Sequence, residues 1–172
     1  MIAVNKILSY LISLQLLVMH SFLKKLLGSW ESVEAIGKYP TIKDFSYNEE
    51  LTFEERGQPI LIYKAITNIE GITKHCESGF IRANPQTNKA FTNEAHNFGL
   101  SVVMEGDISE NKMTLESKDL GRLSVAKEPH VIKIKKVYDL TNEDTLVIST
   151  DMATTSTEMS NHLIVTYKKK IV

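Results

Sequence analysis

The sequence predicts an all-β domain, a ten-stranded antiparallel β-barrel. From Trp30 onward the chain reads as about ten short strands, spaced roughly 8–12 residues apart and separated by turns. No long amphipathic helix lies between these strands, which argues against parallel strands joined by crossover helices. Closure into a barrel removes the two edge strands of such a sheet, and ten strands enclose enough space for a ligand. A two-sheet sandwich is the alternative architecture.

Each predicted strand is an apolar or alternating run between turn-forming residues. In the first strand Tyr47, Leu51 and Phe53 share one face, although Glu49 interrupts it. Turns rich in glycine, asparagine and proline are predicted at 57–59, 68–71, 84–88 and 106. The predicted strands are 47–54, 60–66, 75–81, 89–97, 100–105, 112–116, 122–126, 131–140, 146–152 and 162–169.

Length, charge and cysteine content exclude several classes of protein. The 172 residues suffice for one domain with a sizeable core. A net charge of -1 gives no electrostatic footprint for nucleic acid. The one cysteine, Cys76, excludes a disulfide framework and a cysteine-based zinc finger. The sequence also lacks a glycine-rich phosphate loop, a local zinc-binding histidine motif and a nucleophile elbow.

The N-terminal 22 residues read as an apolar extension of a domain that spans residues 23–172. Residues 7–18 are rich in leucine and isoleucine, which resembles the apolar region of a signal peptide or a marginal membrane anchor. A start at Met19 would instead give a short amphipathic helix that leads into the domain. The single thiol favours a cytoplasmic location, with no membrane role for the barrel. The secretory pathway is the alternative if residues 1–22 act as a signal.

The segment 151–170 is the most informative part of the chain about function. Met152 ends one predicted strand, His162 begins the next, and nine polar, turn-like residues separate them. Antiparallel pairing of these strands places both side chains at the same rim of the sheet. An imidazole and a thioether that face an apolar cavity are suited to hold an iron porphyrin. The alternative is a half-buried strand histidine bonded to a carbonyl group.

Strand parity does not decide whether His162 faces the interior. The last strand is apolar on both faces, with His162 and Ile164 on one and Leu163 and Val165 on the other. Other histidines have weaker claims to a site. His75 and His130 read as strand-end or surface residues, and His96 precedes a Phe98-Gly99 corner from which it could point into the lumen or form a turn hydrogen bond. The other predicted strand of this pair places Leu146, Ile148, Thr150 and Met152 on one face.

Several segments, in order along residues 26–171, resemble the nitrobindin family of small haem-binding β-barrels. They are L-L-G-S-W (26–30), G-K-Y-P-T-I (37–42), H-C-E-S-G-F-I-R (75–82), P-Q-T-N-K (85–89), A-K-E-P-H-V (126–131), M-A-T-T-S-T-E-M-S-N-H-L (152–163) and V-T-Y-K-K (165–169). No single segment is specific, but the set is. The same segments resemble the nitrobindin-like domain at the C-terminus of animal proteins that carry a zinc-binding THAP domain. One cysteine cannot build a THAP zinc site, so that domain is absent from this sequence.

The resemblance implies a calycin-like barrel, similar in shape to fatty-acid-binding proteins, that holds haem b. By correspondence of motifs, His162 is the proximal ligand of the haem iron. The same correspondence places Thr41, His75 and Met152 at the haem. The family keeps ferric haem, binds nitric oxide and isomerises peroxynitrite to nitrate. Haem and these two small molecules are therefore the expected partners, nucleic acid is not, and a homodimer is left open.

The chain departs from the family pattern near the expected haem. Ser32 and Glu34 stand where two glycines often follow the shared tryptophan, Trp30. Lys74 replaces a frequent methionine, and His96 stands where relatives tend to carry glutamine. If His96 faces the lumen, it approaches the distal side of the haem and changes ligand access.

Three functions are consistent with these residues. The first is a haem-dependent peroxynitrite isomerase that also binds nitric oxide. The second is a carrier of a fatty acid or another lipid, which would need a buried arginine clamp built from Arg56, Arg82 and Arg122. The third is a haem-based nitric oxide sensor without turnover.

Overall fold

The computed structural model describes residues 19–171, in which one short helix precedes eleven strands. The elements are α2 (Ser21–Leu26), β1 (Gly28–Tyr39), β2 (Ile42–Ser46), β3 (Asn48–Glu55), β4 (Ile60–Ile69), β5 (Ile72–Asn84), β6 (Lys89–His96), β7 (Leu100–Ile108), β8 (Lys112–Arg122), β9 (Val131–Asn142), β10 (Thr145–Thr154) and β11 (Thr157–Lys169).

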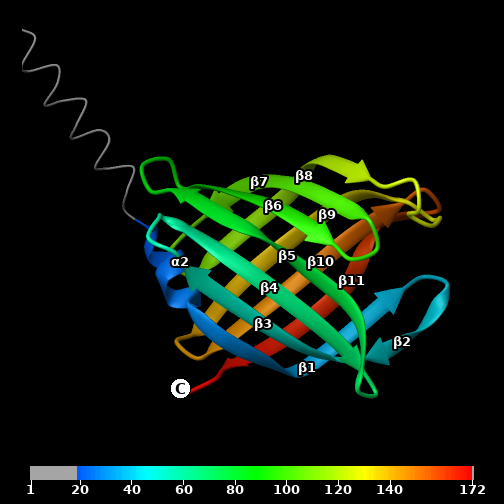
Figure 1. The fold of residues 1–172 in the computed structure, drawn as a ribbon, viewed down its shortest axis with the longest axis horizontal. Helices are drawn as coiled ribbons and strands as arrows, with labels where there is room; N and C mark the ends of the chain where they lie inside the picture. Colours follow the sequence, from blue (N-terminus) through cyan, green and yellow to red (C-terminus); the bar gives the residue numbers. More distant parts are fainter. Residues whose placement is uncertain (1–18, 172) are drawn as a thin grey trace, which may run out of the picture.

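Ten of these strands form a closed antiparallel barrel (Figure 1). Neighbours in sequence pair from β3 to β11, while β1 pairs with β3 along its first residues and with β11 along most of its length. Among the described strands β2 pairs with β1 alone, so the β1–β2 hairpin extends one rim of the barrel. The predicted ten-stranded barrel is therefore confirmed, and the two-sheet sandwich is wrong.

The ten strands of the barrel differ from the ten predicted strands by one exchange. Residues 122–126 are not a strand, because β8 ends at Arg122 and the chain then turns, with the Ala126 amide bonded to the Leu123 carbonyl at 3.0 Å. Strand β1, which the sequence pattern did not separate from its surroundings, completes the barrel in its place. The polar connection between Met152 and His162 is also mostly strand, and its turn is only Thr155-Ser156.

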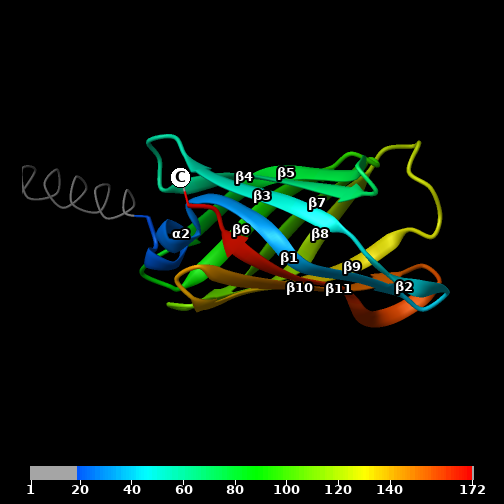
Figure 2. The same cartoon turned by 90° about the horizontal axis from the view of Figure 1, so that it is seen from below.

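Helix α2 packs against one end of the barrel (Figures 1 and 2). Phe22, Leu23 and Leu26 are fully buried, and the Trp30 indole nitrogen donates a hydrogen bond of 2.7 Å to the Leu26 carbonyl. The His20 Nδ1 atom caps the helix by accepting the Phe22 amide at 3.2 Å. The predicted short helix is thus present, and it seals this end of the barrel with apolar side chains.

The barrel interior is packed near α2 and hollow toward the β1–β2 hairpin. Phe53, Leu61 and Leu146 are inward-facing residues near α2, and they belong to the buried core without lining the cavity. On the same strand faces, the residues nearer the other rim line that cavity. Any site in the lumen therefore lies in the half of the barrel away from α2.

Within residues 19–171 there is no helix with the length and apolar character needed to cross a membrane. Residues 1–18, which carry most of the predicted apolar extension, lie outside the described part of the chain. Of the last residues of that extension, Met19 and Phe22 are buried against the barrel.

Candidate functional site

The barrel encloses a mostly apolar cavity of about 460 Å³. This volume lies within the roughly 300–1,000 Å³ that is usual for small-molecule and cofactor sites. Its wall includes three of the four residues that the sequence predicted at a haem site, namely His75, Met152 and His162. The fourth, Thr41, lies in the exposed turn between β1 and β2 and does not line the cavity. A role for Thr41 therefore stays a prediction.

A β-bulge directs His162 toward the cavity. On β11, Leu163 pairs with Thr150 and Asn161 pairs with Asp151, so His162 is skipped in the register with β10. A bulge of this kind re-aims a side chain, and bulges are common beside functional sites. As a result the consecutive residues His162 and Leu163 both line the cavity, although strand parity places them on opposite faces.

The ring of His162 is held in one tautomer by β1. Its Nδ1 atom lies 2.6 Å from the backbone carbonyl oxygen of Lys38, which can only accept, so Nδ1 carries the proton. Burial lowers the pKa of His162, and the ring is therefore neutral near pH 7 with a lone pair on Nε2. Tyr39 packs edge-on against the ring at 6.2 Å between centroids, and its hydroxyl is bonded to Thr154 at 3.2 Å. The carbonyl contact foreseen as the alternative is present, and it is also the contact that prepares a histidine for a metal.

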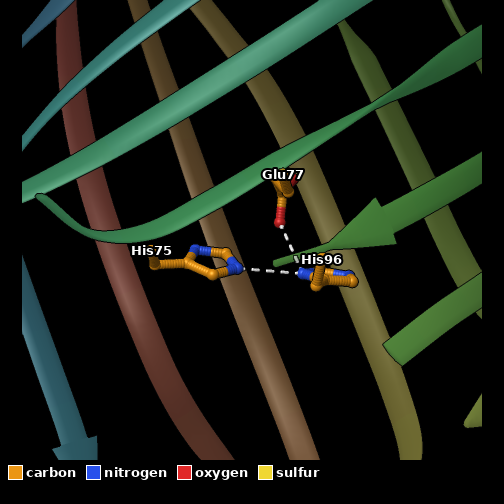
Figure 3. A group of neighbouring side chains, drawn as sticks. All are labelled: His75, Glu77 and His96. Atoms are coloured by element: carbon orange, nitrogen blue, oxygen red, sulfur yellow. Dashed lines mark hydrogen bonds and ion pairs between the residues drawn. The ribbon is translucent and has the colours of Figure 1, made fainter. Parts of the chain in front are cut away.

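His75 and His96 lie together on the cavity wall, on β5 and β6 (Figure 3). Their rings stack at 5.2 Å between centroids, with His75 Nε2 and His96 Nδ1 3.0 Å apart. Phe98 packs against both rings. Burial lowers the pKa of both histidines, that of His96 to about 4. His96 therefore faces the lumen as a neutral imidazole.

A buried ion cluster forms the adjoining part of the wall. Lys136 on β9 donates hydrogen bonds to Glu77 at 2.8 Å and to Glu94 at 2.7 Å, and all three side chains are almost fully buried. Burial alone would lower the pKa of Lys136, but the two carboxylates raise it well above its usual value. Burial would likewise raise the pKa of Glu77, but Lys136 and His96 hold it at about 2. The cluster therefore contains an ammonium ion and at least one carboxylate ion.

Glu49 is a second buried carboxyl group, beside Glu77, that lines the cavity. Its two oxygens accept hydrogen bonds from the Tyr167 hydroxyl and from the Thr67 hydroxyl. Burial raises its pKa, and these two hydrogen bonds partly offset the rise. The nearby Tyr47 hydroxyl is buried with no hydrogen-bond partner among residues 19–171, so it is free to meet a polar atom of a bound molecule.

Sequence reasoning missed the buried acids and Lys136. Glu49 was recognised only as an interruption of an apolar face, while Glu77, Glu94 and Lys136 were not singled out. Strand parity offered a signal, because Glu94 shares a face with His96 and Lys136 shares a face with Ile134 and Tyr138. Charged residues on an otherwise inward face are the pattern that could have identified them.

The low pKa of His96 predicts a pH-dependent loss of stability. Between pH 6.5 and about 4 the unfolded chain binds a proton that the folded ring does not. The free energy of unfolding should therefore fall as pH is lowered through this window. Urea denaturation measures the free energy of unfolding at pH 7.5 and at pH 4.5. The fall between the two pH values should be smaller in His96→Gln than in the wild type, by an amount on the order of 2–3 kcal/mol. His130→Gln, which changes a surface loop, should lose as much unfolding free energy between the two pH values as the wild type does. A loss in His96→Gln equal to that of the wild type would contradict the prediction.

The donor set of the cavity fits a haem. A neutral imidazole with its Nδ1–H bonded to a carbonyl presents Nε2 as a metal ligand, and an apolar wall suits the macrocycle. A closed barrel that presents such a nitrogen at an apolar cavity has the features of a haem-binding β-barrel. Residues 20–169 match the model of the "THAP4-like, heme-binding beta-barrel domain", and the chain belongs to this family. The resemblance to nitrobindin-like domains is thus confirmed.

Comparison with known proteins finds relatives in animals and bacteria. The chain is 40% identical over 147 residues to the human "Peroxynitrite isomerase THAP4", covering 84% of this chain and 26% of that protein. It is 31% identical over 153 residues to the "Peroxynitrite isomerase" of Nocardia farcinica, covering 86% of this chain and 88% of the relative. The crystal structure of Rv2717c from M. tuberculosis superposes with a TM-score of 0.77 at 27% identity, covering 90% of this chain and 100% of that one. The chain spans about a quarter of the length of the THAP4 relatives that it matches.

Proposed function

We propose that this chain binds haem b through His162 and isomerises peroxynitrite to nitrate. The observation that carries the proposal is the Nε2 lone pair of His162, fixed by the Lys38 carbonyl at the wall of an apolar cavity. The relatives from Homo sapiens and Nocardia farcinica, both named peroxynitrite isomerase, support the choice of substrate. Bound ferric haem would supply an open coordination position at which peroxynitrite is activated for rearrangement.

The residues of the chain supply ligation, orientation and exclusion of water. The Lys38 carbonyl keeps the proton on Nδ1 of His162 and so keeps Nε2 free for iron. Acid should weaken haem binding, because protonation of Nε2 competes with ligation. We further propose that Met152 and His75, which line the cavity, contact the haem, and that Thr41 contacts its edge from the β1–β2 turn.

Lys74 gives the cavity a cation for an anionic substrate. It lines the cavity while remaining exposed to solvent, and it forms no ion pair within residues 19–171. Clefts that carry one sign of charge raise the local concentration of ligands of the opposite sign. We infer that Lys74 attracts peroxynitrite to the cavity in its anionic form.

The lipid-carrier alternative has little support in the structure. The candidate clamp residues Arg56, Arg82 and Arg122 are exposed, and none of them lines the cavity. Lys136 is buried there, but Glu77 and Glu94 already neutralise it. A fatty-acid carboxylate would therefore find no free buried cation among these four side chains.

Stopped-flow mixing with peroxynitrite tests the proposed activity. The haem-loaded protein should accelerate the decay of peroxynitrite and raise the nitrate yield at the expense of nitrite, whereas the haem-free chain should do neither. Nitric oxide binding is followed separately by the absorption spectrum of the haem. A haem-loaded protein that binds nitric oxide but leaves peroxynitrite decay unchanged would contradict the isomerase proposal and select the sensor.

A further inference from the structure

A cluster of three potential metal ligands lies on the cavity wall, separate from His162 (Figure 3). His75 and Glu77 lie two residues apart on β5, and His96 pairs directly with Glu77 across the β5–β6 ladder. His96 Nδ1 lies 3.0 Å from His75 Nε2 and 3.4 Å from Glu77 Oε2. One ligand atom from each residue lies within 4.8 Å of the other two. The strand register alone thus brings two imidazoles and a carboxylate to one point.

The His96 ring lies between two carboxyl groups, one near each ring nitrogen. Glu77 Oε2 faces Nδ1 at 3.4 Å, and Glu94 Oε2 lies 3.8 Å from Nε2. With the ring proton on Nε2, the Nδ1 lone pair can accept a hydrogen bond from His75 Nε2 at 3.0 Å, but it also lies 3.4 Å from Glu77 Oε2. The Nε2 atom is buried and has no hydrogen-bond partner among the residues described. A cation between Glu77 and Nδ1 would remove this repulsion, because the ring proton could then stay on Nε2.

We propose that His75, Glu77 and His96 form a binding site for a divalent transition-metal ion in the barrel lumen. Two imidazole nitrogens and one carboxylate oxygen are a set that binds zinc or ferrous iron, with remaining coordination positions open to the cavity. The site does not include the proposed iron ligand His162, although it shares His75 with the proposed haem contacts, and it does not depend on the proposed function.

The groups around the cluster act as an outer shell for the metal. Lys136 binds the other oxygen of Glu77, Oε1, at 2.8 Å and leaves Oε2 directed at His96. Glu94 Oε2 lies 3.8 Å from His96 Nε2, and a carboxylate beside the second ring nitrogen is the usual partner of a metal-bound histidine.

Cobalt titration of the haem-free, chelator-treated full chain tests the site. The expected result is one equivalent of Co²⁺ bound, with visible ligand-field bands that Zn²⁺ displaces. His96→Gln and Glu77→Gln should each weaken cobalt binding by at least about 10-fold, by analogy with the loss of even an outer-shell partner. His162→Ala should retain the cobalt bands, which separates this site from haem ligation.

Matched controls keep the test decisive if a variant folds poorly. His130 and Glu128 form a surface pair, with 3.1 Å between Nε2 and Oε1, so His130→Gln makes the same change at a histidine–glutamate pair outside the cavity. Zn²⁺ should raise the unfolding temperature of the wild type and of His130→Gln, but not that of His96→Gln. Absence of cobalt bands in the wild type, or their persistence in both His96→Gln and Glu77→Gln, would overturn the proposal.

Discussion

Replacement of His162 by alanine is expected to abolish specific haem binding. The substitution removes the Nε2 atom that β1 and the bulge in β11 hold at the cavity wall. Loss of an outer-shell partner alone typically weakens metal binding about 10–100-fold, so loss of the ligand itself should weaken haem binding by at least about 100-fold. Titration with hemin, followed by the Soret band and by quenching of Trp30 fluorescence, measures the affinity.

His130→Ala is the matched control, because it removes a histidine from a surface loop. It should bind hemin as the wild type does. In His162→Gly, added free imidazole should restore a histidine-like spectrum, because it can enter the space left by the side chain. A His162→Ala protein with wild-type affinity and spectrum would place the iron on another residue, and His75 and His96 would be the first to replace.

Replacement of Lys136 by methionine is expected to destabilise the barrel strongly. The change leaves Glu77 and Glu94 buried beside each other without their shared cation. Removing one partner of a buried ion pair typically costs about 3–5 kcal/mol, which is a large part of the roughly 5–15 kcal/mol that stabilises an ordinary domain. Urea denaturation at pH 7.5 should show this loss, and protonation of the orphaned carboxylates should reduce it at lower pH.

Lys112→Met provides the comparison for Lys136→Met. Lys112 forms a 3.2 Å ion pair with Asp139 in which both side chains are largely exposed. Exposed pairs contribute about 0–1 kcal/mol, so this variant should remain close to the wild type. Similar losses in the two lysine variants would contradict the view that the buried cluster depends on Lys136.

The barrel could be predicted because its strands follow simple periodicity. The face formed by Leu146, Ile148, Thr150 and Met152 is interior, as strand parity grouped it. Strand β1 was not separated by sequence because its burial pattern is irregular, with a register shift between Ser32 and Glu34. The loop after β8 was mistaken for a strand because local apolar residues do not show whether a partner strand is present.

The site was only partly predictable because a bulge overrides parity. His162 reaches the cavity because it has no register partner in β10, and the alternation of residues 162–169 does not indicate this bulge. The family resemblance, rather than spacing, identified this residue. Glu77 was missed for a different reason, since an inward face that is polar because it meets a ligand cavity looks like a solvent-facing one. For His96 the sequence left a lumen-facing position and a turn hydrogen bond as alternatives.

A crystal structure of the haem complex would show where the iron is held. Haem should lie in the lumen between the packed α2 end and the β1–β2 rim, with the iron at coordination distance from His162 Nε2 and with Nδ1 still bonded to the Lys38 carbonyl. Iron coordinated by another side chain, or haem bound outside the barrel, would contradict the assignment of His162 as the proximal ligand.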